Sequence, residues 1–228
     1  MNSLTLREEE IFRTLRKLAH CNFVLIGGYA VNAYTLPRFS VDCDIVVKKE
    51  EQKGIESILK TLGYKHTEVI SSDLTYHHSF QRYEKTIQKD IKVSVDVLID
   101  EVFDRKTSVS FSADWIFENS SLKSLKGKTI IENIKLRIIN IDALIILKFV
   151  SARITDIRDI FMLITHVNDI PHLKEAITAR VDFNPHFAKI NAVITSETFK
   201  NNLQGVFGCI DEKLFEKHKT ALLSFNVT

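Results

Sequence analysis

Two aspartates separated by one residue stand at the start of an apolar run. Asp42 and Asp44 directly precede the residues IVV at 45–47. Because side chains alternate along a strand, both carboxylates should point to the same face of a sheet. Neighbouring carboxylates repel each other unless a cation lies between them, and oxygen ligands suit Mg²⁺ or Mn²⁺. The pair therefore predicts a divalent-metal site at the edge of an apolar strand.

A pair of glycines lies upstream of these acids. Gly27 and Gly28 directly follow the apolar residues 23–26. Glycine allows a ligand to approach the backbone closely, and the N–H groups at a helix start can bind an anion. The pair therefore predicts a phosphate-binding turn. Between the glycines and the aspartates, Arg38 and Ser40 could donate further hydrogen bonds to a triphosphate.

A third acid lies inside the most regular strand pattern of the chain, IKVSVDVLID at 91–100. The valines form one face of this strand, and Asp96 falls on the other. A carboxylate in an apolar strand is costly unless it is paired, so we expect Asp96 to share the cation of Asp42 and Asp44. Asp100 is the alternative, but it lies where the strand should already end, and strand position favours Asp96.

The bulk composition is that of an ordinary globular protein. The chain has 228 residues, 45% hydrophobic and 26% charged, with a net charge of +2. This length suits one large or two small domains, and the charge is too small to indicate a nucleic-acid partner. Three distant cysteines show no zinc spacing, the N-terminal segment is unlike a signal peptide, and no apolar run is long enough to span a membrane. We expect a cytoplasmic protein.

The elements that must position these residues follow from periodicity and from glycine and proline positions. We expect an α/β (α+β) fold in which a small mixed sheet is followed by a helical C-terminal domain. Before residue 140 we expect helices at 4–20, 29–36 and 49–62. We expect strands at 22–26, 41–47, 64–70, 91–100, 129–131 and 135–139, and an edge strand at 76–83. A short strand and a helix should lie within 103–119, and a basic loop at 120–128. After residue 140 we expect helices at 142–152, 155–167, 171–181, 188–201 and 211–225. The predicted domains are a catalytic core at 1–135 and a helical domain at 136–228.

The pattern Gly27-Gly28, Arg38-x-Ser40-x-Asp42-x-Asp44 and then Asp96 resembles the nucleotidyltransferase superfamily of the DNA polymerase beta type. The resemblance implies that the glycines and donors hold a nucleotide, and that the three acids hold Mg²⁺ or Mn²⁺. Two departures are visible. Glycine stands where the superfamily often has serine after the first glycine, and Cys43 stands where an aliphatic residue is usual. We expect Cys43 to pack in the core as a small hydrophobe.

A second motif lies in the helical half. Lys148, followed by Arg153-x-x-Asp156-x-x-Asp159, resembles the AbiEii-type nucleotidyltransferase toxins. The resemblance implies that Lys148 meets the nucleotide phosphates and that Asp156 or Asp159 orients this lysine or acts as a base. It implies transfer of an NMP from an NTP to a hydroxyl, either of an RNA such as the 3′ end of a tRNA or of a protein side chain. It also implies a toxin with an antitoxin partner.

Other readings of these residues stay open from the sequence. An Asp-x-Asp pair also occurs in metal-dependent glycosyltransferases, and the chain could be a non-catalytic nucleotide- or RNA-binding module on the same fold, or an interaction protein that uses its helical half. Lys148 could extend to the surface, and Asp156 and Asp159 could belong to a solvated helix face. His77 and His78 could be a base or metal ligands, or polar residues of an edge strand.

Overall fold

The computed structural model describes residues 2–67, 79–208 and 210–226. They form two compact units. The first unit comprises Met1–Ala33, Pro37–Val102 and Ser110–Ile139, and the second comprises Tyr34–Leu36, Phe103–Val109 and Asn140–Thr228. None of the described helices is long and apolar enough to cross a bilayer.

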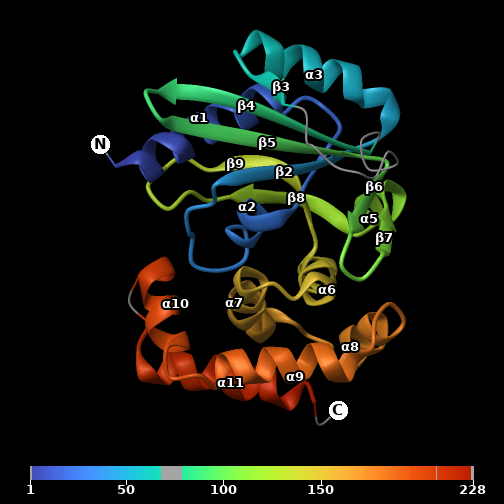
Figure 1. The fold of residues 1–228 in the computed structure, drawn as a ribbon, viewed down its shortest axis with the longest axis vertical. Coiled ribbons are helices and arrows are strands. Elements are labelled where there is room, and N and C mark those ends of the chain that lie inside the picture. Colours follow the sequence, from blue (N-terminus) through green and yellow to red (C-terminus); the bar gives the residue numbers. More distant parts are fainter. Residues whose placement is uncertain (1, 68–78, 209, 227–228) are drawn as a thin grey trace. The chain divides into compact units, whose positions relative to one another are not determined.

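The first unit is built on a mixed sheet, for which the described residues give seven strands in the order β3-β4-β5-β2-β1-β9-β8 (Figure 1). Strands β2 and β5 run parallel, as do β1 and β9, and the other neighbours are antiparallel. The strands are β1 Val24–Leu25, β2 Asp42–Val47, β3 Lys65–Thr67, β4 Phe80–Gln88, β5 Ile91–Ile99, β8 Ser120–Leu125 and β9 Ile134–Ile139. The mixed α/β fold expected from the sequence is thus confirmed.

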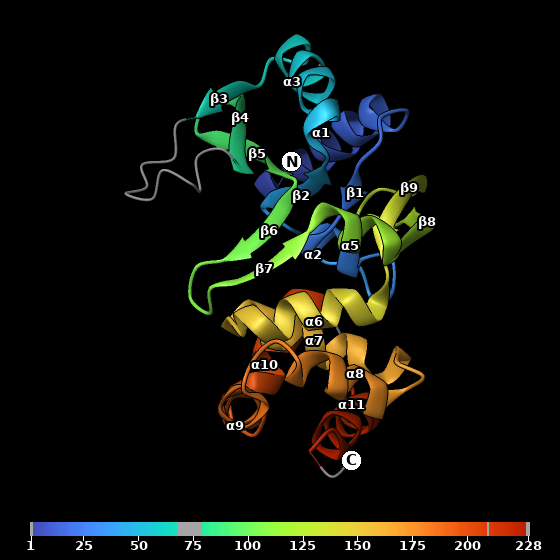
Figure 2. The same cartoon turned by 90° about the vertical axis from the view of Figure 1, so that its right-hand side faces the viewer.

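Two helices, α1 (Ser3–Leu18) and α3 (Gln52–Thr61), cover one face of this sheet (Figure 2). The valines of β5 point to this face, and so does Lys85 of β4, whose ammonium lies 2.7 Å from the Glu10 carboxylate of α1. Because strand side chains alternate, the residues between the valines belong to the opposite face. The apolar core therefore lies under α1 and α3, and the acids of β2 and β5 are kept out of it.

Three expectations for this unit were wrong. Strand β4 is internal rather than an edge strand, since it pairs with β3 and β5. The segment expected as a basic loop at 120–128 contains strand β8, which pairs antiparallel with β9 and forms the sheet edge. An edge strand tolerates polar side chains and an exposed Leu122, so its composition resembles that of a loop. Residues 129–131 form no strand.

The remaining elements of this half of the chain are short. They are α2 Gly27–Val31, the 3-10 turn η1 Lys49–Glu51, the hairpin strands β6 Glu101–Asp104 and β7 Val109–Ser112, and α5 Ala113–Glu118. Helix α2 begins earlier and ends earlier than the helix expected at 29–36. Strand β3 lies within the strand expected at 64–70, and residues 68–78, which include the end of that strand, His77 and His78, lie outside the described residues.

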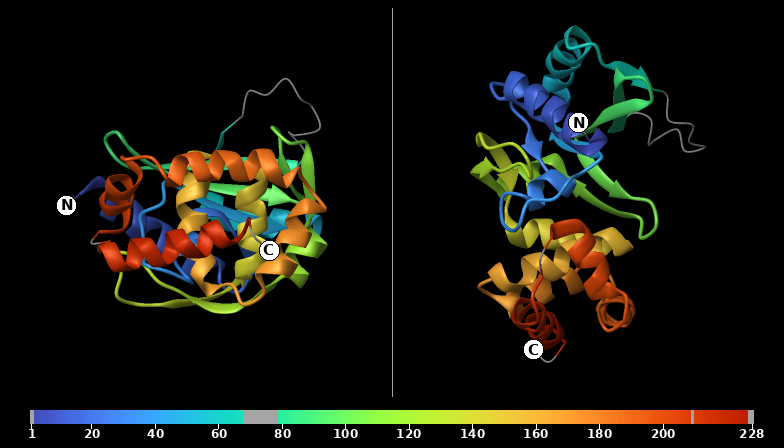
Figure 3. Two further views of the ribbon diagram at one scale, coloured as in Figure 1. Left: turned by 90° about the horizontal axis from the view of Figure 1, so that it is seen from below. Right: turned by 90° about the vertical axis from the view of Figure 1, so that its left-hand side faces the viewer.

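After residue 140 the second unit is helical. Its helices are α6 Ile141–Ser151, α7 Ile154–Leu163, α8 Ile170–Thr178, α9 Phe183–Ile194, α10 Phe199–Phe207 and α11 Glu212–Ser224, with the 3-10 turn η2 Ile164–His166 after α7. Helix α7 contacts α6, α9 and α11, and in the view from below α9 and α11 cross in front of α6 and α7 (Figure 3, left). The Phe161 ring of α7 lies 5.1 Å from Phe199 and 5.3 Å from Phe215, measured between ring centroids. The helix expected at 188–201 starts earlier because the Asp182 side chain caps the N-terminus of α9.

Candidate active site

The register of β2 against β5 places the predicted acids side by side. Asp44 aligns with Asp96, and Asp42 aligns with Ser94. All four residues point to the face of the sheet opposite the valines, because they occupy alternate positions of neighbouring strands. In the antiparallel pair of β4 and β5, Arg82 aligns with Asp96. A row of charged residues thus crosses three strands.

Arg82 holds the buried acid of this row. Its Nε donates to Asp96 Oδ1 at 2.8 Å, and its Nη2 donates to Oδ2 at 2.7 Å. The Asp96 side chain is only 7% exposed, whereas that of Arg82 is 33% exposed. Burial raises the pKa of the Asp96 carboxyl, and the Arg82 guanidinium partly opposes this shift. The same Nη2 lies 3.9 Å from Asp42 Oδ1, so the guanidinium leans toward the second acid.

Arg82 is a site residue that the sequence pattern does not predict. The buried Asp96 carboxylate needs a cation, and the sequence alone points to a metal ion rather than to Arg82. The signal in the sequence is a charged residue, Arg82, in the strand that precedes the strand of Asp96. Only the pairing of β4 with β5 brings these two residues together, and local sequence pattern does not predict that pairing.

The two other acids have different surroundings. Asp42 is half-exposed, and its Oδ1 accepts a short hydrogen bond from the Ser94 hydroxyl. The Asp44 carboxylate lies directly against the backbone of Gly27, where an added Cβ would overlap it. Gly27 also has a left-handed backbone, with φ of 65°. Glycine is therefore required here for two independent reasons.

Gly28 has a similar relation to the predicted phosphate donors. A Cβ at Gly28 would overlap the Ser40 hydroxyl and crowd the Arg38 guanidinium. Arg38 is buried, and Asn32 bonds its backbone on both sides, at 3.0 Å to the N–H and 2.9 Å to the carbonyl. Ser40 donates to the Asp42 carbonyl at 3.2 Å. The structure thus brings the glycine pair, Arg38 and Ser40 next to the strand that carries the acids.

The acid face fits a divalent cation in its donor chemistry. Three carboxylates on neighbouring strands match the oxygen ligands that Mg²⁺ prefers, and the missing Cβ of Gly27 leaves room for the Asp44 carboxylate. Within the described ranges, however, no three His, Cys, Asp or Glu side chains already form a ligand set. Arg82 engages both oxygens of Asp96, and Ser94 engages Asp42.

Asp100 and Cys43 lie where the sequence predicts them, beyond the end of β5 and in the core. Asp100 lies beyond β5 with a positive φ of 63°, and its carboxylate accepts from the Lys49 N–H at 2.8 Å, away from the acid row. Cys43 is fully buried among apolar side chains, and burial raises the pKa of its thiol. Asp100 therefore caps a turn, and Cys43 packs in the core.

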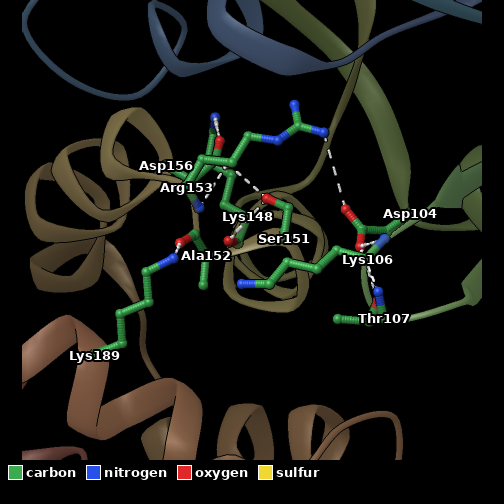
Figure 4. Close-up of polar contacts among 9 residues, drawn as sticks. All are labelled: Asp104, Lys106, Thr107, Lys148, Ser151, Ala152, Arg153, Asp156 and Lys189. Atoms are coloured by element: carbon green, nitrogen blue, oxygen red, sulfur yellow. Dashed lines mark hydrogen bonds and ion pairs between the residues drawn. The ribbon is translucent and has the colours of Figure 1, made fainter.

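In the second unit, Lys148 is buried between two acids. Its Nζ lies 2.8 Å from Asp159 Oδ2 and 3.1 Å from Asp156 Oδ1. Asp159 is fully buried, and Asp156 Oδ2 accepts a bond of 2.6 Å from the Ser151 hydroxyl (Figure 4). The readings in which Lys148 extends to the surface, or the two acids belong to a solvated helix face, are therefore wrong. Both acids contact the lysine.

The junction between α6 and α7 creates this arrangement. Ala152 has a left-handed backbone, with φ of 43°, and its N–H bonds to the Lys148 carbonyl at 2.9 Å. The chain then restarts as α7 with Arg153 at the N-cap, and the Asp156 side chain accepts from the Arg153 N–H at 3.3 Å. This capping contact fixes Asp156 over the last turn of α6.

Comparisons with known proteins assign the chain to a family. The model of the family "Nucleotidyl transferase AbiEii toxin, Type IV TA system" matches residues 11–225. The crystal structure of JHP933 from Helicobacter pylori is similar over 100% of this chain and 92% of its own, with a TM-score of 0.55 and 17% identity. The solution structure of the antibiotic-resistance factor ANT(2'')-Ia is similar over 82% of this chain and 96% of its own, with a TM-score of 0.53 and 16% identity.

At these identities the two solved structures show the shared fold. No curated protein sequence matches the chain. The family match covers nearly the whole chain, including both motifs, and it favours nucleotidyl transfer over the glycosyltransferase reading. The chain therefore belongs to the AbiEii family and is a nucleotidyltransferase.

Proposed function

We propose that this enzyme moves an NMP from an NTP to a hydroxyl group, with Asp42, Asp44 and Asp96 as ligands of Mg²⁺ or Mn²⁺. The observation that carries the proposal is the strand register, which gathers these three acids on one sheet face beside the Gly27 turn. A divalent ion held there would neutralise phosphate charge and lower the pKa of the attacking hydroxyl.

The other residues of this face bind and orient the nucleotide. Gly27 and Gly28 let Asp44, Ser40 and Arg38 pack against the start of α2. The first N–H groups of this helix have no partner inside the helix and can bind a phosphate. Arg38 and Ser40 lie against Gly28 and can donate to the same phosphates. Arg82 orients Asp96 within the sheet through both carboxylate oxygens, and its partly exposed guanidinium can give way to a metal ion.

The helical unit supplies a positioned cation. We assign Lys148 to contact with the nucleotide phosphates, and Asp159 and Asp156 to its orientation. The support is that both carboxylates contact the Lys148 ammonium and that Ser151 and the α7 backbone fix Asp156 in turn. An ammonium held by two carboxylates loses little conformational freedom when it meets a ligand.

The family description supports the biological part of the proposal. We propose that the enzyme is a toxin acting in the cytoplasm, where NTP is available, and that an antitoxin protein is its partner. The acceptor hydroxyl belongs to an RNA, such as the 3′ end of a tRNA, or to a protein side chain. Growth arrest on induced expression, absent for a variant without the acids, is the expected phenotype.

A labelling experiment tests the activity. Each α-³²P-labelled NTP is incubated with the enzyme, Mg²⁺, and either total RNA or an RNA-free protein extract, and the labelled product identifies the acceptor class. The Asp42→Asn/Asp44→Asn double variant should lose at least about 100-fold in rate, the scale expected for lost electrostatic stabilisation. Asp90→Asn is the matched control, since Asp90 lies in the exposed turn between β4 and β5. Equal labelling by the double variant would refute the proposal.

A further inference from the structure

Two exposed lysines from different elements of the second unit lie next to each other. Lys106 stands at the tip of the hairpin between β6 and β7, and Lys189 stands on α9. The Lys189 ammonium donates a short hydrogen bond to the Ala152 carbonyl, at the end of α6. Desolvation lowers the pKa of Lys189, and the nearby Lys106 ammonium lowers it further. Across the part of the chain that the structure describes, neither lysine forms an ion pair with a carboxylate.

The hairpin tip is built to hold Lys106 in this place. Asp104 Oδ1 accepts three hydrogen bonds from the tip: from the Lys106 N–H at 3.1 Å, the Thr107 N–H at 2.9 Å and the Thr107 hydroxyl at 3.0 Å. The Asp104 side chain is only 12% exposed. Its other oxygen lies 4.0 Å from the Arg153 guanidinium, which is itself 74% exposed. Figure 4 shows the Lys106 and Lys189 side chains reaching the end of α6 from two sides, with Arg153 beside them and its guanidinium directed toward Asp104.

The contacts within the protein explain only part of this cluster. A lysine that bonds the last carbonyls of a helix is a normal C-terminal partner, which accounts for Lys189. It gives no reason for a second ammonium beside it, because neighbouring like charges disfavour the charged state. The nearby Asp156 carboxylate raises the pKa of Lys189 and offsets part of the repulsion, but its two oxygens are already engaged by Lys148 and Ser151. An anion bound between the exposed cations would relieve the remaining repulsion.

We propose that Lys106, Arg153 and Lys189 form a phosphate-binding subsite beside the Lys148–Asp156 pair. Two ammonium groups and a guanidinium supply the donors that phosphate oxygens prefer. The phosphate belongs either to the polyphosphate chain of the nucleotide or to a phosphodiester of a polynucleotide acceptor. Only this choice of source rests on the proposed function, because the subsite itself is a property of the helical unit and its hairpin.

Binding measurements on the intact chain test the subsite without turnover. The variant is Lys106→Gln/Lys189→Gln, and the matched control is Lys213→Gln/Lys217→Gln, which removes two exposed lysines from α11. The probes are inorganic tripolyphosphate and a fluorescein-labelled single-stranded RNA, each titrated between 50 and 200 mM salt. We expect the variant to bind at least one probe about tenfold more weakly. For RNA, the slope of log Kd against log salt should fall by about 0.7 for each lost phosphate contact.

The outcomes separate the two sources. A loss confined to RNA identifies a phosphodiester of the acceptor, and a loss confined to tripolyphosphate identifies the nucleotide. Wild-type affinity and salt slope for both probes would overturn the proposal. The single variant Lys106→Gln guards against a folding defect, since this side chain lies at an exposed hairpin tip, and it should give a smaller loss of the same kind. An Asp42→Asn/Asp44→Asn enzyme that still binds both probes would show that the subsite stands even if nucleotidyl transfer fails.

Discussion

In the first unit the buried charge is a carboxylate on a strand, Asp96, and its partner is the guanidinium of Arg82. In the second unit the buried charge is an ammonium on a helix, Lys148, and its partners are two carboxylates. The Arg82 side chain is partly exposed, so it can move away from Asp96, whereas Asp159 is fully buried and stays in contact with Lys148. We infer that the acid face can exchange its counter-ion, while the lysine is a fixed part of its helix pair.

The largest effect should come from opening the sealed pair. Asp159→Ala leaves a buried ammonium with Asp156 alone, and breaking a buried ion pair costs about 3–5 kcal/mol. Urea denaturation should show this loss in the free energy of unfolding. Asp156→Ala should cost less, because Asp156 is partly exposed and its helix can be capped by water. Similar stability of wild type and Asp159→Ala would show that the ion pair between Lys148 and Asp159 does not stabilise the packing of α6 against α7.

The exchangeable pair should give a smaller effect that depends on metal. Arg82→Met leaves the Asp96 carboxylate buried without its guanidinium, at a cost of about 1–3 kcal/mol. Mn²⁺ should restore part of this stability and should bind the variant at least as tightly as wild type, because no guanidinium competes with it. Thermal melts and Mn²⁺ titration measure both quantities. Arg16→Met is the control, since Arg16 forms an exposed ion pair on α1. A variant that Mn²⁺ does not stabilise would argue against ion exchange at this face.

The backbone of the acid face can be tested with glycine. Gly27→Ala places a side chain in a left-handed conformation, at a cost of about 1–2 kcal/mol, and it also displaces the Asp44 carboxylate. Activity should fall more than stability does. Gly205→Ala on α10 meets no neighbouring atom and should stabilise the helix by up to about 1 kcal/mol. Full activity of Gly27→Ala would show that the Asp44 position is not critical.

The smallest expected effect concerns pH and the core of the second unit. Burial lowers the pKa of His218, whose Nδ1–H donates to the Phe161 carbonyl at 2.8 Å. The unfolded chain therefore binds this proton more readily than the folded chain does, so stability falls as pH drops below the ordinary value of 6.5. His218→Gln should lose less stability than wild type between pH 7.5 and 5.5, as measured by urea denaturation at both pH values. Equal losses would show that His218 does not couple folding to pH.

The sequence was sufficient for those features that arise from local pattern. Strict alternation at 91–100 correctly placed Asp96 on the face opposite the valines, and the Asp42-x-Asp44 spacing put both acids on one side of β2. Contacts between residues far apart in the sequence could not be predicted. Arg82 meets Asp96 only through the register of β4 with β5, and Lys106 meets Lys189 only because a hairpin tip lies on a helix unit. Strand β8 was missed because an edge strand needs little apolar sequence.

We propose that the acid face transfers a nucleotidyl group. The most direct measurement compares NTP labelled at the α-phosphate with NTP labelled at the γ-phosphate, in the presence of Mg²⁺ and the acceptor found by labelling. We expect the acceptor to take up the α-label alone and the γ-label to leave as pyrophosphate. Asp44→Asn should abolish both, whereas Asp90→Asn should not. Transfer of the γ-label to the acceptor, or undiminished α-labelling by Asp44→Asn, would contradict the proposal.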